Sequence, residues 1–223
     1  TGHAADITAA ISKRGTSHYF HGTAIAMLPD TLSQHAALKP LEDRNAVVCR
    51  LKVSTEGEVT QAEIVLALVQ SRAKLSYPEV EDVFQEKAPH TFTDELSHLQ
   101  NCFRALRQRR EACELVIEHR PEHRWIMNDE KQITSIERVE KKSSQLLVEE
   151  CMVAANRAIA NALKEAQMPG PFVTHAGIRR DRAEEAQEFL KRYQPDLEGL
   201  EFSTLEGFRT LITALNASSD ERP

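Results

Sequence analysis

The sequence predicts an α+β fold, in which antiparallel β-hairpins pack with several helices. Strand-like alternation and turn signals occur in the first third of the chain, whereas amphipathic helical patterns dominate the remainder. The two kinds of segment do not alternate regularly, as they would in a doubly wound parallel sheet. A mixed fold with separate hairpins and helices is therefore expected.

The first hairpin is expected between residues 46 and 69. Apolar and polar residues alternate from Ala46 to Val53, which predicts a half-buried strand. Residues 54–57 form a turn signal that ends in Gly57, and the apolar segment Val59–Val69 predicts the second strand. The side chains expected to face inward on the first strand are Val47, Cys49, Leu51 and Val53.

Periodicity predicts the remaining elements. The signal S-x-x-E over Ser76–Glu79 is a capping box and predicts a short helix from Pro78 to Gln85. Longer helices are expected over 93–113, 143–167, 182–193 and, after a second capping box over Ser203–Glu206, up to Leu215. Short strands are expected at 115–117, 124–127, 133–139 and 172–174, and the segment 14–20 is expected to be a loop.

Composition bounds the class of protein. The chain has 223 residues, of which 41% are hydrophobic and 28% charged, so it is one large domain or a domain and a half. The longest apolar stretch, Ile64–Val69, is too short to cross a membrane. A formal net charge of −6 argues weakly against a protein that binds nucleic acid over its whole surface, but leaves room for a basic groove.

The N-terminus and the cysteines indicate the compartment. The first residues lack the basic and apolar regions of a signal peptide, and the chain lacks an initiator Met, which indicates a piece of a longer protein. Cys49, Cys102, Cys113 and Cys151 are widely spaced and contain no C-x-x-C pair. We expect four free thiols in a cytoplasmic protein.

No complete catalytic centre can be built from the residues alone. The sequence has no G-x-S-x-G, no Walker loop and no G-x-G-x-x-G. His119 and His123 have a spacing that a zinc site could use, but they lack a second pair of ligands and are more simply surface histidines. The aspartates are too scattered for a magnesium site. No metal ligands are therefore predicted.

Three smaller groups could contact a ligand. Tyr19 lies beside basic residues, where it could stack on a base or simply pack against the body. Tyr77 opens a capped helix, where it could face a phosphate or merely start the helix. Glu149 and Asn156 share one stripe of their helix and could hold a ribose or base, or be solvated. Periodicity leaves these alternatives open.

Several ordered motifs are similar to those of one known family. The segments 14–20 (R-G-T-S-H-Y-F) and 27–33 (M-L-P-D-T-L-S) resemble the R-G-T-S-x-Y-F and M-L-P-x-x-L-S signature of the RNB catalytic domain of the ribonuclease II and ribonuclease R exoribonucleases. Segments 71–77, 147–156 and the region of His175 follow in the same order. Residues 120–126 and 203–208 resemble the ribonuclease II branch in particular.

This resemblance implies a function and roles for the residues. The family degrades single-stranded RNA processively from the 3′ end to nucleoside 5′-monophosphates with Mg²⁺. By position, Tyr19 matches a tyrosine that clamps bases, Tyr77 one that lines the catalytic cavity, and Glu149 a glutamate that contacts the terminal nucleotide. Ile117 falls where relatives carry a stacking phenylalanine.

The resemblance also implies what the chain lacks. The family's aspartate cluster precedes the R-G-T-S motif and its T-S-P-I-R-x-Y arginine follows the position of Pro223, so residues 1–223 are expected to be the central portion of an RNB domain. Mg²⁺ would then be bound by residues outside this chain, which alone would be inactive. The alternative is a non-catalytic RNB-like protein that binds RNA or another partner.

Overall fold

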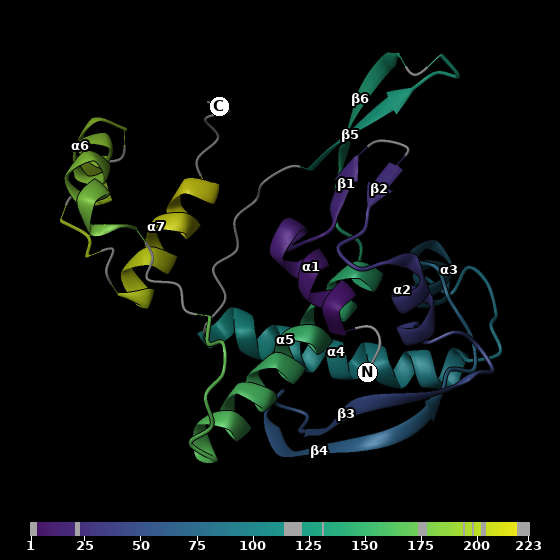
Figure 1. The fold of residues 1–223 in the computed structure, drawn as a ribbon. Helices are drawn as coiled ribbons and strands as arrows, with labels where there is room; N and C mark the ends of the chain where they lie inside the picture. Colours follow the sequence, from purple (N-terminus) through teal and green to yellow (C-terminus); the bar gives the residue numbers. More distant parts are fainter. Residues whose placement is uncertain are drawn as a thin grey trace. The chain divides into compact units, whose positions relative to one another are not determined.

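The structure is a computed structural model that describes residues 4–20, 23–113, 122–130, 132–173, 178–193, 195–197, 199–201 and 204–217. Helices and antiparallel two-stranded hairpins make up these residues, which confirms the α+β prediction (Figure 1). The chain divides into two compact units. The first comprises Thr1–Val48 and Ile64–Leu75, and the second comprises Cys49–Glu63 and Ser76–Pro223.

The first unit begins with elements that periodicity does not predict. Helix α1 (Ala4–Arg14) is followed by the hairpin of β1 (His18–Phe20) and β2 (Thr23–Ile25), and then by α2 (Asp30–Ala36). The expectation of a loop over 14–20 is therefore wrong for residues 18–20. Strands of three residues are too short to display a period of two, so only pairing with a neighbour reveals them.

The long hairpin of β3 (Asp43–Val53) and β4 (Val59–Gln70) confirms the strand prediction and contributes to both units. Its turn closes through the Gly57 N–H, which donates to the Ser54 carbonyl at 3.0 Å. Gly57 has φ +77°, and a Cβ there would lie 2.1 Å from the Ala105 carbonyl oxygen. Only glycine fits this turn, which packs against the helix that carries Ala105.

One face assignment on β3 is wrong. Val47 was expected to face inward with Cys49, Leu51 and Val53, but its side chain is 65% exposed while Val48 is half-buried. The alternation changes phase between Val48 and Cys49, where the chain passes from one compact unit to the other. A pattern of period two cannot reveal such a change because both sides of the break are apolar.

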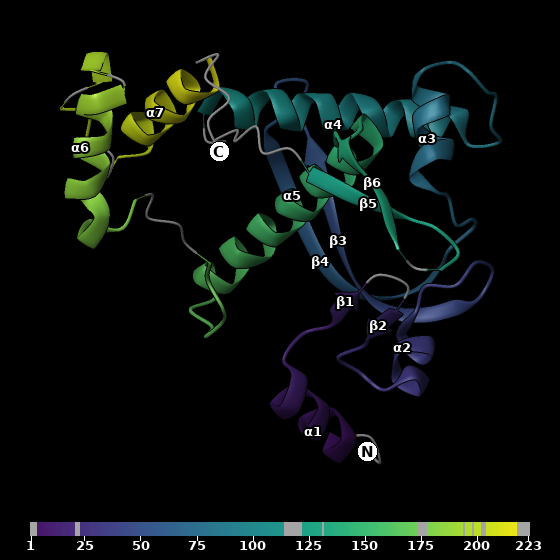
Figure 2. The same ribbon diagram turned by 90° about the horizontal axis from the view of Figure 1, so that it is seen from above.

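Three helices form the centre of the second unit: α3 (Tyr77–Phe84), α4 (Thr93–Cys113) and α5 (Ser143–Glu165). Each contacts the other two, and their positions confirm the predicted helices (Figure 2). The capping box of α3 is present, with the Ser76 N–H donating to Glu79 Oε2 at 2.6 Å. The buried apolar residues of this core are Val83, Leu96, Phe103, Leu106, Leu147, Ala154 and Ala158.

The hairpin of β5 (Glu122–Met127) and β6 (Ile133–Val139) joins α4 to α5 in the sequence. Its strands are antiparallel, and Trp125 lies opposite Ile136. The predicted strand 115–117 lies outside the described residues. The predicted strand 172–174 is not formed at Phe172 and Val173, because neither residue has a pairing partner among the residues that the structure describes.

The C-terminal part has its own small core. Two single-turn 3₁₀ helices (Arg180–Arg182 and Pro195–Leu197) accompany α6 (Ala183–Tyr193) and α7 (Leu205–Ala217). Leu190 and Leu211 are buried at their contact, with Ile178, Ala186, Leu197, Leu200, Phe208 and Leu215 around them. Phe189 of α6 is 50% exposed.

The last helix begins one residue later than the S-x-x-E signal suggests. The Gly207 N–H donates to Thr204 Oγ1 at 3.1 Å, so Thr204 caps the helix, whereas Ser203 lies outside the described residues. A search of the described helices for one long and apolar enough to cross a membrane found none.

Candidate functional site

The candidate site centres on two adjacent glutamates of α5. The side chain of Glu149 is 38% exposed, whereas that of Glu150 is fully buried. Successive residues of a helix point about 100° apart, so one carboxylate can face solvent while its neighbour enters the core. Glu149 is the predicted RNA-contacting residue, and sequence reasoning missed Glu150.

A signal for Glu150 was nevertheless present in the sequence. The buried residues Leu147, Ala154 and Ala158 of α5 define an apolar stripe, and position 150 falls on it, three residues after Leu147 and four before Ala154. A carboxylate on such a stripe requires a cationic partner, because an unpaired buried charge is strongly unfavourable. The partners come from α4.

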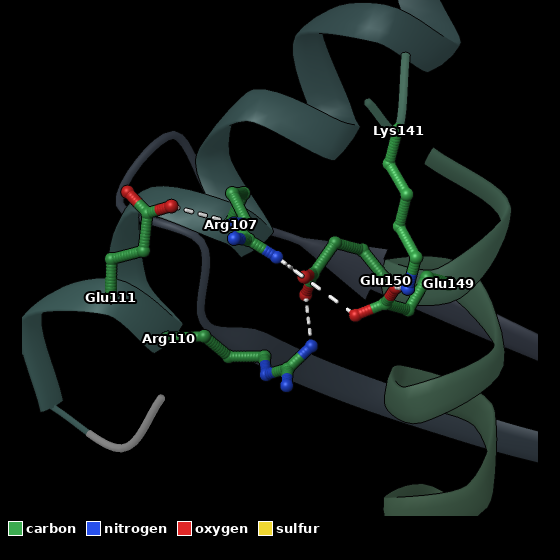
Figure 3. A network of polar contacts seen from close by, with 6 residues as sticks. All are labelled: Arg107, Arg110, Glu111, Lys141, Glu149 and Glu150. Atoms are coloured by element: carbon green, nitrogen blue, oxygen red, sulfur yellow. Dashed lines mark hydrogen bonds and ion pairs between the residues drawn. The ribbon is translucent and has the colours of Figure 1, made fainter. Parts of the chain in front are cut away.

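Arg107 and Arg110 of α4 both point at Glu150 (Figure 3). Arg107 Nη1 donates to Glu150 Oε1 at 3.0 Å, and Arg110 Nη1 donates to Oε2 at 2.7 Å, so each carboxylate oxygen has its own guanidinium. Arg107 also donates through Nε to Glu111 at 2.6 Å. These bonds fix α4 against α5 at the position of Glu149.

The Glu149 carboxylate therefore lies between two cations. Arg107 Nη1 is 4.0 Å from Glu149 Oε1, and Lys141 Nζ is 3.3 Å from Glu149 Oε2 (Figure 3). Partial neutralisation of this kind lowers the repulsion between a carboxylate and a polyanion. The exposed oxygens can still accept hydrogen bonds from hydroxyl or amino groups of a nucleotide.

A second carboxylate ties α3 to α5. Glu81 is buried, and its carboxylate accepts the Ser144 N–H at 3.0 Å and the Gln85 side-chain amide at 2.9 Å. Burial alone would raise the pKa of Glu81, but these hydrogen bonds to the ionised form outweigh burial and lower the pKa. An anion at the N-terminus of α5 is also favoured by the helix dipole.

Tyr77 lies at the start of α3, and its side chain is 49% exposed. The structure thus places Tyr77 and Glu149 on two helices that pack together and are joined through Glu81. At the N-terminus of α3, the Ser76 and Glu79 N–H groups are both used within the capping box. A phosphate contact here would depend mainly on the Tyr77 hydroxyl.

Tyr19 belongs to the first unit, whereas Tyr77 and Glu149 belong to the second. It lies on β1 opposite Ala24, and its side chain is 81% exposed, with Phe20 beside it at 60%. An aromatic ring displayed on a short hairpin is accessible to a stacking base. Asn156, which shares a stripe with Glu149, is exposed, and Ile117 lies outside the described residues.

A cavity of about 430 Å³ is lined in part by Glu150 and Arg110 of the buried ion pair. It lies between the turn after β3 and helices α4 and α5, and its charged lining residues include Arg109, Arg110, Glu150 and Arg157. Cations and carboxylates are mixed in this lining, so it shows no preference for either sign of ligand charge.

The described residues do not fit a metal ion. Among them, no group of three or more His, Cys, Asp or Glu side chains is arranged to hold one, and His119 lies outside the described part of the chain. All four cysteines are free thiols. Burial raises the pKa of Cys102 and of Cys151, which disfavours the thiolate that metals and electrophiles require.

Nearly the whole chain matches the model of one protein family. Residues 3–223 match the model of the RNB domain, and the chain therefore belongs to the RNB family. This finding confirms the resemblance of the R-G-T-S and M-L-P segments to that family.

The similar proteins include members named ribonuclease R and members named exoribonuclease 2. The chain is 33% identical over 170 residues to ribonuclease R of Escherichia coli, covering 73% of this chain and 21% of the relative. It is 31% identical over 219 residues to exoribonuclease 2 of Yersinia pseudotuberculosis, covering 95% of this chain and 34% of the relative. The chain thus spans about a third or less of these curated relatives.

Solved structures show the same fold. The chain superposes on Mycoplasma genitalium RNase R in complex with ribose-methylated single-stranded RNA with a TM-score of 0.85, covering 98% of this chain and 35% of that protein at 17% identity. The complex of that RNase R with double-stranded RNA gives a TM-score of 0.84, covering 99% of this chain and 40% of that protein at 19% identity.

Proposed function

We propose that this chain is the RNA-holding central portion of a processive 3′→5′ exoribonuclease that releases nucleoside 5′-monophosphates from single-stranded RNA. The observation that carries the proposal is the RNB-domain match over residues 3–223. Relatives named exoribonuclease 2 and ribonuclease R support it, as does a related protein seen in complex with single-stranded RNA.

The proposed roles of the residues follow from their chemistry and exposure. Tyr19 stacks on a base near the 3′ end, since its ring is largely exposed. Glu149 accepts hydrogen bonds from the terminal nucleotide, and Arg107 and Lys141 reduce the repulsion of its carboxylate from the RNA backbone. Tyr77, at the start of α3, is assigned to the catalytic cavity of the complete enzyme, beside the same nucleotide.

The Mg²⁺ that activates water for hydrolysis is proposed to bind to residues outside these 223. The described residues include no group of His, Cys, Asp or Glu side chains that could hold this metal. Mg²⁺ in the complete enzyme would be held by the family's aspartates, and this chain would hold and orient the RNA. A cytoplasmic location and membership of the ribonuclease II branch are part of the same proposal.

The test uses the full-length protein that contains this chain and a 5′-labelled oligo(A) substrate. Glu149→Gln is expected to lower turnover about tenfold or more, because a charged hydrogen-bond partner in a binding site contributes about 1.5–3 kcal/mol. Tyr19→Ala is expected to lengthen the final product, because the last bases lose their stacking partner. Product length is read on a sequencing gel.

Glu165→Gln is the matched control, since Glu165 is an exposed carboxylate at the end of the same helix and the same substitution there is expected to leave turnover unchanged. Normal turnover of Glu149→Gln would show that Glu149 is not an RNA contact. An unchanged final product of Tyr19→Ala would show the same for Tyr19.

The second candidate function is RNA binding without catalysis. Mg²⁺-dependent release of mononucleotides by the full-length protein decides between the two functions, because only the enzyme releases them.

A further inference from the structure

The β5–β6 hairpin has two chemically different faces. Trp125 lies opposite Ile136, and His123 lies opposite Arg138. Residues opposite each other in an antiparallel pair project to the same side, and successive pairs alternate between sides, so every second pair shares a face. We call the face formed by His123, Trp125, Ile136 and Arg138 the Trp125 face. All four side chains are exposed, Trp125 by 53% and Ile136 by 61%.

The arginine of the opposite face is paired with a carboxylate. Arg124 lies opposite Glu137, and the guanidinium Nη2 is 3.1 Å from Glu137 Oε2. On the Trp125 face, by contrast, none of the four residues is a carboxylate. Within the part of the chain that the structure describes, the Arg138 guanidinium makes no ion pair or hydrogen bond, so no carboxylate there offsets its charge.

An exposed indole beside a guanidinium that pairs with none of the described residues matches single-stranded nucleic acid. Bases stack on aromatic side chains in a sequence-tolerant way, and arginine contacts the phosphate between them. An apolar protein surface would also suit the exposed Trp125 and Ile136, but it would offer no anion to Arg138. RNA offers both a base and a phosphate. The charge of this face is complementary to RNA.

In the sequence, the Trp125 face lies close to the candidate site. Strand β6 ends at Val139, and Lys141, two residues later, pairs with Glu149. Arg138 is therefore separated from this pair by only a few residues of backbone. The Trp125 face and the candidate site are therefore neighbours in the sequence, and both offer groups that suit RNA.

We propose that the Trp125 face is a second RNA contact, in which Trp125 stacks on a base and Arg138 binds the adjoining phosphate. The inference rests on the proposed function, since it takes single-stranded RNA as the ligand, and it adds contact residues other than Tyr19, Tyr77 and Glu149.

The chain offers a direct readout, because Trp125 is its only tryptophan. Titration of the 223-residue chain with unlabelled oligo(A) is expected to quench tryptophan emission at the same RNA concentrations that raise the anisotropy of a labelled oligo(A). Trp125→Leu is expected to weaken binding about fivefold or more, and Trp125→Phe, which keeps a ring, less.

The arginine is tested by its salt dependence. Arg138→Gln is expected to weaken binding and to reduce the slope of log affinity against log salt by about 0.7, the value for one phosphate contact on a single strand. Arg124→Gln is the matched control: it removes the same charge from the opposite face of the same hairpin, and is expected to leave the slope unchanged. Circular dichroism verifies that each variant is folded.

The possible results separate this inference from the proposed function. If the chain binds RNA while tryptophan emission stays constant and Trp125→Leu binds as tightly as the unsubstituted chain, the Trp125 face is not an RNA contact, although the RNA-holding role stands. Equal salt slopes for Arg138→Gln and the unsubstituted chain would also overturn the inference. Absence of any RNA binding would overturn the RNA-holding role along with it.

Discussion

At the scale of single residues, the two glutamates at 149 and 150 have opposite environments. Glu149 keeps part of its carboxylate in solvent between Arg107 and Lys141, whereas Glu150 is buried between Arg107 and Arg110. Their chemistry in the sequence is identical. The difference arises from the direction in which each position of α5 faces, and it separates the proposed ligand contact from a structural ion pair.

Glu150→Ala is expected to destabilise the protein strongly. The substitution leaves two guanidinium groups partly buried without their carboxylate, and breaking a buried pair in this way costs about 3–5 kcal/mol. Urea unfolding followed by circular dichroism measures the change in the free energy of unfolding.

The neighbouring Glu149→Ala is the control for this measurement. Glu149 is partly exposed, so its loss is expected to cost less than about 1 kcal/mol while RNA turnover in the full-length protein falls. Equal losses of stability for the two variants would show that Glu149 is structural and that the distinction is incorrect.

At the scale of elements, helices α3 and α5 are joined through a single carboxylate. Glu81 on α3 accepts the Ser144 N–H in the first turn of α5, and Ser144 is itself buried. This contact places Tyr77, at the start of α3, on an element fixed to the one that carries Glu149. The packing of helices therefore builds the candidate site from segments about 70 residues apart.

The Glu81 contact makes stability depend on pH. The pKa of Glu81 is lower in the folded protein than its ordinary value of 4.5, so the unfolded chain takes up a proton first as pH falls. The stabilisation is present above about pH 4.5 and is lost as pH falls through the lower folded pKa. Urea unfolding from pH 7 down to the acid limit of folding measures this loss.

Glu81→Gln is expected to be less stable at neutral pH and to lose less stability on acidification. The comparison variant is Glu63→Gln, because Glu63 is an exposed carboxylate paired with Arg50 on the surface. Parallel pH profiles for Glu81→Gln and the unsubstituted chain would show that Glu81 does not contribute in this way.

At the scale of the whole molecule, the structure separates two compact units, and the predicted RNA residues are divided between them. Tyr19 belongs to the first unit, whereas Tyr77 and Glu149 belong to the second. The net charge of −6 is compatible with RNA binding, because the proposed contacts depend on local cations such as Arg138 rather than on a basic surface throughout.

The 223-residue chain by itself is expected to bind oligo(A) but to release no mononucleotides from poly(A) in the presence of Mg²⁺. The reason is that the residues described by the structure offer no group able to hold the metal that activates water. Thin-layer chromatography of labelled products measures release, with the full-length protein as the positive control. Robust Mg²⁺-dependent release by the chain alone would show that it contains a metal site of its own.

The sequence by itself determined the α+β class, the long helices, the β3–β4 hairpin and the family, because each depends on local periodicity or on motifs that can be read in order. Only the tertiary structure decided that residues 18–20 form a strand, that Val47 faces solvent, and that Glu150 rather than Glu149 is the buried partner of Arg107 and Arg110. These features depend on contacts between segments distant in the chain. Such contacts create the burial and charge pairing that give chemically identical residues different roles.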